Sequence, residues 1–291
     1  MISIIVTAYK EEKTINKCLK SITSQKISEP FEVLVIAPDK ETLMSAKESY
    51  KKARIFKDKG IGKFAALNLG FEQAKGEVMI LCDGDTYLGK NSINYMIDAF
   101  KNRDVGCASG RVVSINPKNN MLGYWSHLLV EAAHNERLKR SSKKLFIDCS
   151  GYLLGLRKGI VKELPPNLLS EDAYISHYVW SKGYDTAYSP KAEVFVKYPT
   201  TLSDWIKQKR RSAGGYHQIN NYFRQDVKMR SLKNEIIKGP SYALSYAKNP
   251  IELVWSLLLF PIRLYLWILT FYDRLVKKSF KQVWQRVETT K

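Results

Sequence analysis

The stretch VMILCDGD, residues 78–85, runs five apolar residues directly into Asp83 and Asp85, with Gly84 between them. A short apolar run of this kind is typical of a buried strand. A carboxylate at the edge of a core is costly unless a neighbouring group neutralises its charge. That group could be an arginine, a set of backbone amides or a metal ion, and the rest of the sequence has to decide between them.

The first hundred residues alternate short apolar segments with segments of helical spacing. This alternation indicates an α/β fold with a mostly parallel, open sheet that helices cover on both faces. We expect strands at residues 2–6, 31–37, 53–56 and 77–82, and helices at residues 11–25, 41–52, 63–75 and 91–102.

Several polar segments follow directly after the expected strands. They are Tyr9, Asp39, residues 60–63 and residues 83–85. In open α/β sheets, ligands bind at the carboxyl ends of the strands. We therefore expect these segments to face one crevice.

The composition sets the class of protein and of partner. The chain has 291 residues, 45% of them hydrophobic, and its four cysteines form no CxxC pair, which disfavours zinc and redox sites. The net charge is +19, and residues 204–291 carry 17 basic but only 6 acidic side chains. Such a basic region predicts a polyanionic partner: nucleic acid, anionic lipid or a phosphorylated substrate.

Residues 253–272 are apolar over twenty positions, which is long enough to span a bilayer. Pro261 and Arg263 lie near the middle, where a charge is costly, and tryptophan and tyrosine residues occur along the tract. We favour a pair of helices that is broken at Pro261 and lies in the membrane interface. A single span and a core helix of the soluble domain remain as alternatives.

The DGD segment has three interpretations. A turn after a strand is the simplest, because Asp and Gly are common in turns. A dinucleotide site is the second, because Gly60, Gly62 and Ala65 follow a strand, open a helix and precede Asp83. The third is a diphosphate bridged by Mg²⁺ or Mn²⁺, which bind through one or two carboxylates and substrate phosphates.

Four segments carry a resemblance to a known family. They are IIVTAYKEEKTINKCLKSI, GKFAALNLGFEQAKGEVMILCDGD, SEDAYISHYVWSKGY and QKRR. In this order they resemble the successive motifs of the family 2 glycosyltransferases, from residue 2 to about residue 215. The resemblance implies a GT-A fold and an inverting, metal-dependent transfer of a sugar from a nucleotide-sugar donor.

The resemblance implies a role for each matching residue on the donor side. Thr7, Tyr9 and Glu11 match the loop that holds the base and ribose, and Lys63 matches the basic residue near the donor's phosphates. In the DxD pair, Asp83 is implied on the ribose side and Asp85 is implied as the ligand of Mn²⁺ or Mg²⁺.

The remaining matches concern catalysis and the acceptor. Asp172 matches the catalytic base, and Gln208 and Arg211 match the QxxR part of a QxxRW motif that serves the acceptor and diphosphate. Asp39 follows the second strand in place of paired aspartates and is assigned to the nucleotide sugar. Ser212 stands where processive polymerases have tryptophan, which disfavours a polysaccharide synthase.

The physical reading of these residues agrees with the resemblance. A metal offsets the charge that develops on a departing nucleoside diphosphate, and a carboxylate can take the proton of an acceptor hydroxyl. At residue 172 the alternative is a helix start, with Ser170 as the cap and the acids at the positive helix end.

The sequence therefore predicts a hexosyltransferase whose catalytic domain spans residues 1–230. Residues 231–291 are expected to form basic, apolar, amphipathic helices at the cytoplasmic face of the cell membrane, either peripheral or with one C-terminal span. The expected donor is a UDP- or GDP-sugar, and the expected acceptor is a glycan or a polyprenyl-phosphate lipid. The alternatives are an NAD-type oxidoreductase and a basic nucleic-acid-binding protein, although no nucleic-acid-reading module is recognisable.

Overall fold

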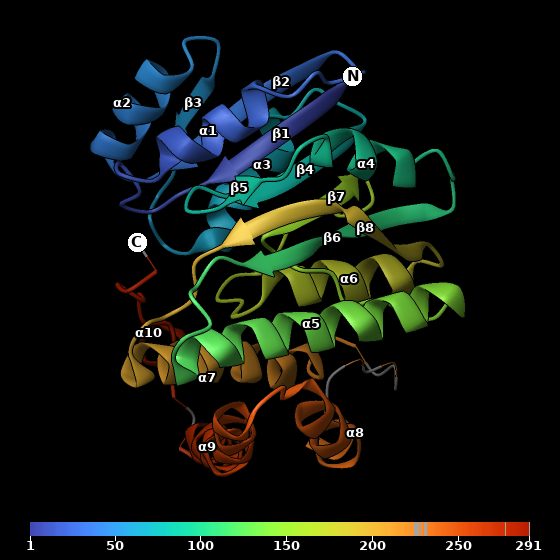
Figure 1. The fold of residues 1–291 in the computed structure, drawn as a ribbon. Helices are drawn as coiled ribbons and strands as arrows, with labels where there is room; N and C mark the ends of the chain where they lie inside the picture. The colour runs from blue at the N-terminus through green and yellow to red at the C-terminus, as the bar shows by residue number, and fades with distance from the viewer. Residues whose placement is uncertain (224–226, 228, 230–231, 277, 291) are drawn as a thin grey trace.

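The computed structural model describes residues 1–223, 227, 229, 232–276 and 278–290, with the backbone alone at residues 232–236, 238 and 281. Within these ranges the chain folds around one eight-stranded sheet with helices on both faces (Figure 1). The order of the strands is β3-β2-β1-β4-β7-β6-β8-β5. The strands are β1 (Ile2–Thr7), β2 (Phe31–Ala37), β3 (Arg54–Lys57), β4 (Val78–Asp83), β5 (Tyr87–Leu88), β6 (Val105–Ser114), β7 (Leu153–Arg157) and β8 (Asp185–Val196).

Up to β8 the helices alternate with the strands, except that β5 directly follows β4, and after β8 the helices follow one another. They are α1 (Ile15–Thr23), α2 (Lys40–Ser49), α3 (Lys63–Gln73), α4 (Ser92–Ala99), α5 (Met121–Ser142), α6 (Glu171–Ser181), α7 (Leu202–Ile219), α8 (Leu232–Tyr246), α9 (Pro250–Leu275) and α10 (Phe280–Val283).

The sheet has a parallel half and a mixed half. Strands β3, β2, β1 and β4 are parallel, as the apolar segments predicted. Strand β7 runs antiparallel to both β4 and β6, whereas β6 and β8 are parallel. The carboxyl ends of β1 to β4 therefore lie along one edge, because parallel strands end on the same side.

Two apolar layers hold the sheet. One cluster packs side chains of β1 such as Ile4 and Val6 against α1, α2 and α4. The other cluster packs Ile5, from the opposite face of the same strand, against α3 and α6. The alternation of Ile4, Ile5 and Val6 between two apolar layers explains why the first strands have almost no polar residue.

Helix α9 is a single helix, so the predicted break at Pro261 is wrong. It runs without interruption through Pro261, although proline lacks the N–H that an interior helical position donates. Packing supports the helix on both sides of this residue: Leu259 and Leu266 are buried in a cluster with Trp125 of α5 and Trp205 of α7. This burial offsets the cost of the missing hydrogen bond.

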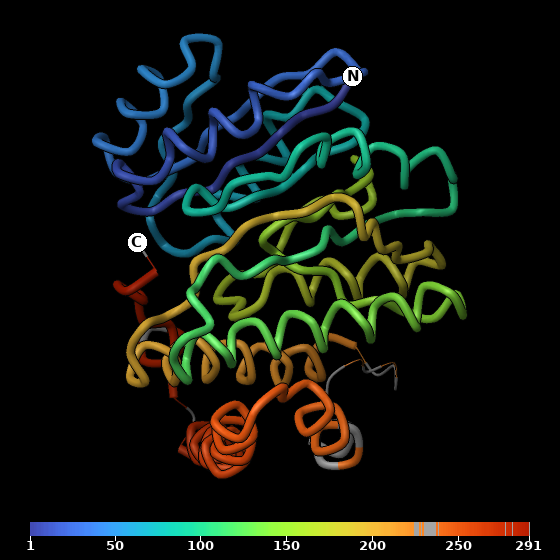
Figure 2. Tube along the Cα trace, in the orientation of Figure 1, coloured from blue at the N-terminus to red at the C-terminus, as the bar shows by residue number. Residues whose placement is uncertain are grey.

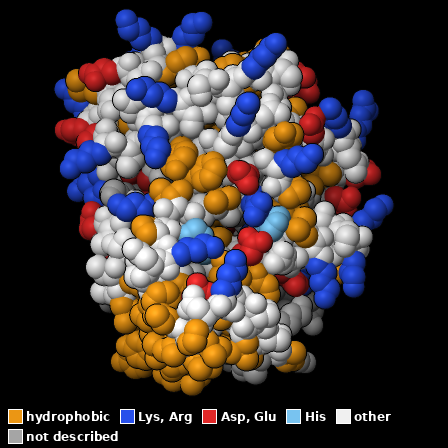
Figure 3. All heavy atoms as spheres, in the orientation of Figure 1, with side chains coloured by type: hydrophobic (Ala, Val, Ile, Leu, Met, Phe, Trp, Pro, Cys, Tyr) orange, Lys and Arg blue, Asp and Glu red, His pale blue; other side chains and the backbone are white. Residues whose placement is uncertain are grey.

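The outer face of α9 is apolar and exposed. Among the described residues, α9 is the one helix that is long and apolar enough to cross a membrane. Figure 3 shows hydrophobic side chains gathered at the bottom of the molecule, where α9 lies in Figure 1. The exposed side chains of this apolar face include Val254, Leu257, Leu264, Ile268, Phe271 and Leu275. This exposure makes a core helix, the third alternative, the least favoured.

Candidate active site

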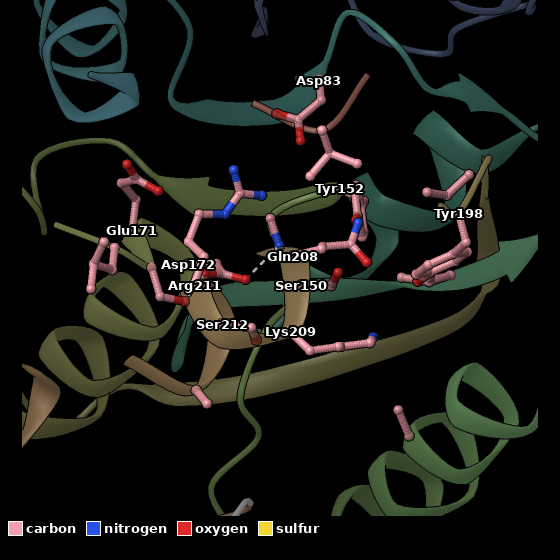
Figure 4. Close-up of a pocket in the computed structure, with 18 of the residues that line it drawn as sticks. Asp83, Ser150, Tyr152, Glu171, Asp172, Tyr198, Gln208, Lys209, Arg211 and Ser212 are labelled. Atoms are coloured by element: carbon pink, nitrogen blue, oxygen red, sulfur yellow. Dashed lines mark hydrogen bonds between the residues drawn. The ribbon is translucent and has the colours of Figure 1, made fainter. Parts of the chain in front are cut away.

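A cavity of about 2000 Å³ opens at the carboxyl ends of β1, β3 and β4 and extends along α5 and α7 to α9. Figure 4 shows Asp83 on one side of it, across from Asp172, Gln208 and Arg211. Of the ten predicted site residues, nine line this cavity and Asp39 does not. The crevice expected from the strand ends is therefore present.

The end of β4 carries a charged cluster. Lys63, the first residue of α3, forms an ion pair with Asp83, and the Thr7 hydroxyl lies 3.4 Å from the same carboxylate. Burial disfavours the charge of Lys63, but Asp83 and Glu171 outweigh burial and raise the pKa of Lys63 above its usual value. Lys63 is therefore a fixed cation at the cavity wall.

Asp85 follows in a tight turn that glycine makes possible. The backbone N–H of Gly84 donates to the carbonyl of Thr7 at 2.9 Å, and a Cβ at Gly84 would lie only 2.8 Å from that of Ala8. The described residues contain no group of three or more histidines, cysteines or acids that could hold a metal. Asp85 nevertheless offers the oxygen ligands that Mg²⁺ or Mn²⁺ prefers, and those ions take their other ligands from substrate phosphates and water.

The loop after β1 carries the residues predicted to hold the nucleotide. Tyr9 is exposed, whereas the Glu11 carboxylate is buried and accepts a hydrogen bond from the Thr14 hydroxyl at 2.6 Å. Asp39 accepts from the backbone N–H groups of Lys10 and Thr42 at 2.9 and 3.0 Å.

Asp39 thus caps α2, away from the cavity wall. Burial opposes its charge, but the donors from Thr42 and Lys10 outweigh burial and lower the pKa of Asp39. Its assignment to the nucleotide stays a prediction. Asp58 lines the cavity instead, directly after β3, although no sequence motif singled it out. The rule of strand ends, applied to the segment at residues 53–56, would have found it.

Asp172 lies in the first turn of α6 with both carboxylate oxygens oriented by donors. Oδ1 accepts from the Ser170 hydroxyl at 2.5 Å and from the Ala173 N–H at 3.0 Å, and Oδ2 accepts from the Gly151 N–H at 2.9 Å. Ser170 is at the N-cap position but makes no side-chain cap, because its hydroxyl donates to Asp172. Asp172 is therefore a fixed acceptor at the cavity wall.

Glu171 is a second carboxyl at this wall. Burial raises its pKa to about 7, and the positive charge of Lys63 opposes part of this rise. Asp172 adds a like charge beside it, which raises the pKa further. Glu171 thus changes its charge near neutral pH, within a cluster where Lys63 keeps its own.

Gln208 and Arg211 reach the cavity from α7. Gln208 is buried, and its Nε2 lies 3.4 Å from the hydroxyl of Tyr152. The Arg211 guanidinium lies 5.7 Å from the ring centre of Trp284, which comes from the C-terminal end of the chain. Tyr152 and Trp284 were not among the predicted site residues, because neither belongs to a motif or follows a strand end.

The far end of the cavity is mainly apolar. It lies between α5, α8 and α9, and its lining includes Leu128, Leu129, Ala133, Ala243, Phe260 and Leu264. Cations that line the cavity include Lys209 of α7 and Arg263 of α9, together with Arg137 and Lys139 of α5. One continuous space therefore joins the charged cluster at the strand ends to the helix with the exposed apolar face.

Comparison with known families decides the assignment. The family described as glycosyl transferase family 2 matches residues 3–165, more than half of the chain. This chain belongs to glycosyl transferase family 2. The predicted family is confirmed, and membership of it favours a glycosyltransferase over the dinucleotide-binding and nucleic-acid-binding alternatives.

Curated relatives agree. A poly-beta-1,6-N-acetyl-D-glucosamine synthase of Staphylococcus epidermidis is 26% identical over 228 residues, which cover 75% of this chain and 55% of the relative. An N-acetylglucosaminyltransferase of Neorhizobium galegae is 22% identical over 237 residues, which cover 73% and 54% of the two chains. The chain thus spans about half the length of the curated relatives it matches.

Solved structures confirm the fold. A mannosyltransferase of Pyrobaculum calidifontis, in complex with GDP-Man and Mn²⁺, is similar with a TM-score of 0.62 at 16% identity, covering 88% of this chain and 72% of the other. TarS residues 1–349 of S. aureus, in complex with UDP-GlcNAc, is similar with a TM-score of 0.50 at 16% identity, covering 85% and 73%. The GT-A fold predicted from the motifs is therefore present.

Proposed function

We propose that this chain transfers a sugar from a nucleotide-sugar donor to an acceptor, with inversion at the anomeric carbon. The convergence of Lys63, Asp83, Asp172 and Arg211 on one cavity carries this proposal. Two cations can meet the diphosphate, and Asp172 lies across the same space from Asp83 (Figure 4). Nucleotide sugars and nucleotides are bound by the similar mannosyltransferase and by TarS.

At the diphosphate end, Lys63 and Arg211 offset the negative charge of the phosphates. Asp85 is the residue that would hold Mn²⁺ or Mg²⁺, with phosphate oxygens as further ligands. A bound divalent cation supplies charge stabilisation to the leaving nucleoside diphosphate. The Mn²⁺ in the similar mannosyltransferase supports this choice of ion.

In the transfer step, the acceptor oxygen attacks the anomeric carbon from the face opposite the diphosphate. The bond from this carbon to the phosphate oxygen breaks, and its electron pair leaves with the nucleoside diphosphate. Asp172 takes the acceptor's proton through Oδ2, which has one internal donor, the Gly151 N–H. The donors from Ser170 and Ala173 keep the carboxylate in one orientation.

The nucleotide occupies the loops after β1, β2 and β3 in this proposal. Thr7, Tyr9 and Glu11 are placed at the ribose and base, and Asp58 joins them because it lines the same part of the wall. A UDP- or GDP-sugar is the proposed donor. The similar solved structures bind one or the other nucleotide, so a direct comparison of the two decides.

The acceptor is placed at the α5–α9 end and is lipid-linked. The apolar lining suits a hydrocarbon chain, and Lys209 and Arg263 suit a phosphate or pyrophosphate near it. The exposed apolar face of α9 and the excess of basic residues after 204 suit an anionic membrane surface. We therefore propose a catalytic part at residues 1–230 that residues 231–291 hold at the cytoplasmic face of the membrane.

One screen tests the proposal. The full chain is incubated with Mn²⁺, a panel of UDP- and GDP-sugars and a lipid extract, and the released nucleoside diphosphate is measured. We expect release with one nucleotide and a gain when lipid extract is added. If a water-soluble glycan alone gave as much release as the lipid extract, the acceptor would be a glycan and not a lipid. If no donor gave any release, the proposal would be contradicted.

A further inference from the structure

The chain ends in a tail that returns to the catalytic edge. We define the C-terminal tail as residues 279–290, which follow α9 and include α10. Its helix begins with a capping box, in which Ser279 and Gln282 exchange hydrogen bonds. Figure 2 shows the tail rising from α9 past one end of α7 towards the loops near α1 and α2. The tail thus runs from the apolar end of the cavity to its nucleotide end.

Side-chain contacts fix the tail at two places. The Thr289 N–H and hydroxyl both donate to the Asp204 carboxylate of α7, at 3.1 and 3.0 Å. The Arg286 guanidinium donates to the backbone carbonyl of Lys10 at 2.9 Å and lies 5.8 Å from the ring centre of Tyr9. The tail therefore joins the helix of Gln208 and Arg211 to the loop proposed for the nucleotide.

Trp284 occupies the space between these two elements and lines the cavity. Its ring lies 6.3 Å from the Tyr9 ring in an edge-on arrangement and is stacked on Phe280 at 6.4 Å. The Arg211 guanidinium lies over the ring of Trp284, 5.7 Å from the ring centre. A cation held against an aromatic ring has fewer orientations open to it, so this contact fixes Arg211.

The position of Trp284 is of interest because this chain departs from the QxxRW pattern. The residue after Arg211 is Ser212, so α7 brings no indole of its own to this place. The tail brings one from the end of the chain. Arg211 therefore has an aromatic ring beside it in the folded protein, although the residue that follows it in the sequence is not aromatic.

We propose that the C-terminal tail is part of the donor site, with Trp284 as a positioning residue that holds the Arg211 guanidinium towards the diphosphate. Arg286 holds the Tyr9 loop at the other side of the nucleotide. The inference rests on the proposed function, because it takes Arg211 and Tyr9 as donor-binding residues. It adds that nucleotide affinity depends on residues outside the family motifs.

The test is calorimetric binding of UDP and of GDP, each with Mn²⁺, to the full chain and its variants. Trp284→Leu keeps an apolar side chain but removes the ring, and we expect its Kd to rise about tenfold. Trp284→Phe keeps a ring and should bind with a Kd close to that of the wild type. Gln285→Ala, an exposed residue of the same tail, is the matched control and should bind as wild type does.

A double-mutant cycle separates positioning from general support of the fold. If Trp284 acts through Arg211, then Trp284→Leu should cost little more in a chain that already carries Arg211→Ala. Equal losses in both backgrounds would overturn the positioning role. Thermal unfolding shows whether each variant is folded. If Trp284→Leu does not fold, Arg286→Gln tests the role of the tail in its place. We expect its Kd for the nucleotide to rise about threefold.

The outcomes separate this inference from the proposed function. Nucleotide binding by the wild type with unchanged affinity in Trp284→Leu and Arg286→Gln would overturn the role of the tail and leave the glycosyltransferase proposal standing. No binding of either nucleotide by the wild type would overturn both.

Discussion

At the strand end of the cavity, charged side chains face one another, whereas at the α5–α9 end most of the lining is apolar. Lys63, Asp83 and Glu171 surround the first region, and Leu128, Phe260 and Leu264 are among the side chains that line the second. The first region suits a ligand whose charge changes during a reaction. The second suits an apolar ligand, because burying its surface away from water is favourable in free energy. One cavity can therefore hold two substrates of opposite character, each at the end that matches it.

The largest effect is expected at the charged end. Asp85→Ala removes the carboxylate proposed to bind the divalent cation, so turnover should fall by about a hundredfold to a thousandfold. Release of nucleoside diphosphate measures this loss. Asp98→Ala, which removes an exposed carboxylate of α4, is the control and should keep full activity. Full, metal-dependent activity in Asp85→Ala would show that the site lies elsewhere.

Asp172→Asn separates binding from chemistry at the same end. The amide keeps the shape of the side chain but cannot take a proton, so transfer to a hydroxyl should fall by about a hundredfold or more. Donor binding by calorimetry should stay unchanged. The wild-type product should show an inverted anomeric configuration by NMR, and retention would rule out the single displacement. A loss below tenfold would indicate an acceptor that arrives ionised, such as a lipid phosphate.

Changes on the exposed apolar face of α9 should alter binding to membranes and leave the transfer reaction unchanged. Ile268→Glu and Phe271→Glu place charges on the exposed face of α9, and each should weaken binding to anionic vesicles by about tenfold. Flotation of vesicles measures this binding. Met44→Glu, at an exposed apolar residue of α2, is the control. Release of nucleoside diphosphate with a water-soluble acceptor should be the same in all of them. Wild-type flotation in both α9 variants would contradict the membrane-facing role.

The smallest effect concerns stability and pH. Because the folded protein raises the pKa of Glu171 from 4.5 to about 7, it binds this proton more tightly than the unfolded chain does. The wild type therefore loses stability as the pH rises from about 4.5 through 7. Glu171→Gln removes this loss, so its Tm should exceed the wild-type value by a few degrees at pH 8, with a smaller difference at pH 4.

Glu163→Gln changes an exposed carboxyl and serves as the control for this comparison. It should show no gain in Tm that grows with pH. A constant difference between Glu171→Gln and the wild type at both pH values would mean that Glu171 does not titrate between 4.5 and 7.

The parallel half of the sheet could be predicted because its signals are local. The apolar run before Asp83 and the helix after Lys63 each specify their own element, and parallel strands bring their ends to one edge by geometry. The place of Asp172, in the first turn of one helix and at the cavity wall, followed from a motif of a few residues. Each of these features depends on only a few neighbouring residues, so it can be recognised in the sequence.

The rest depends on contacts between distant parts of the chain. Nothing near Trp284 indicates that its ring meets Arg211, because that contact depends on how the tail folds back. The predicted break at Pro261 was wrong for the same reason. A proline weakens a helix locally, but the burial of Leu259 and Leu266 against other helices is a tertiary contribution that no local pattern contains.

One ion pair joins α9, the helix with the exposed apolar face, to α7, the helix that carries Arg211. Both oxygens of Asp273, in α9, accept from Arg210 of α7, and Lys278 lies 3.0 Å from the same carboxylate. Helix α7 also carries Gln208 and Arg211, so α9 cannot sink or rise without moving them. On the bilayer surface that we propose, the height of the reacting centre above the lipid is therefore a property of the enzyme. In that proposal, an acceptor would have to carry its reactive oxygen at this same distance from the membrane surface.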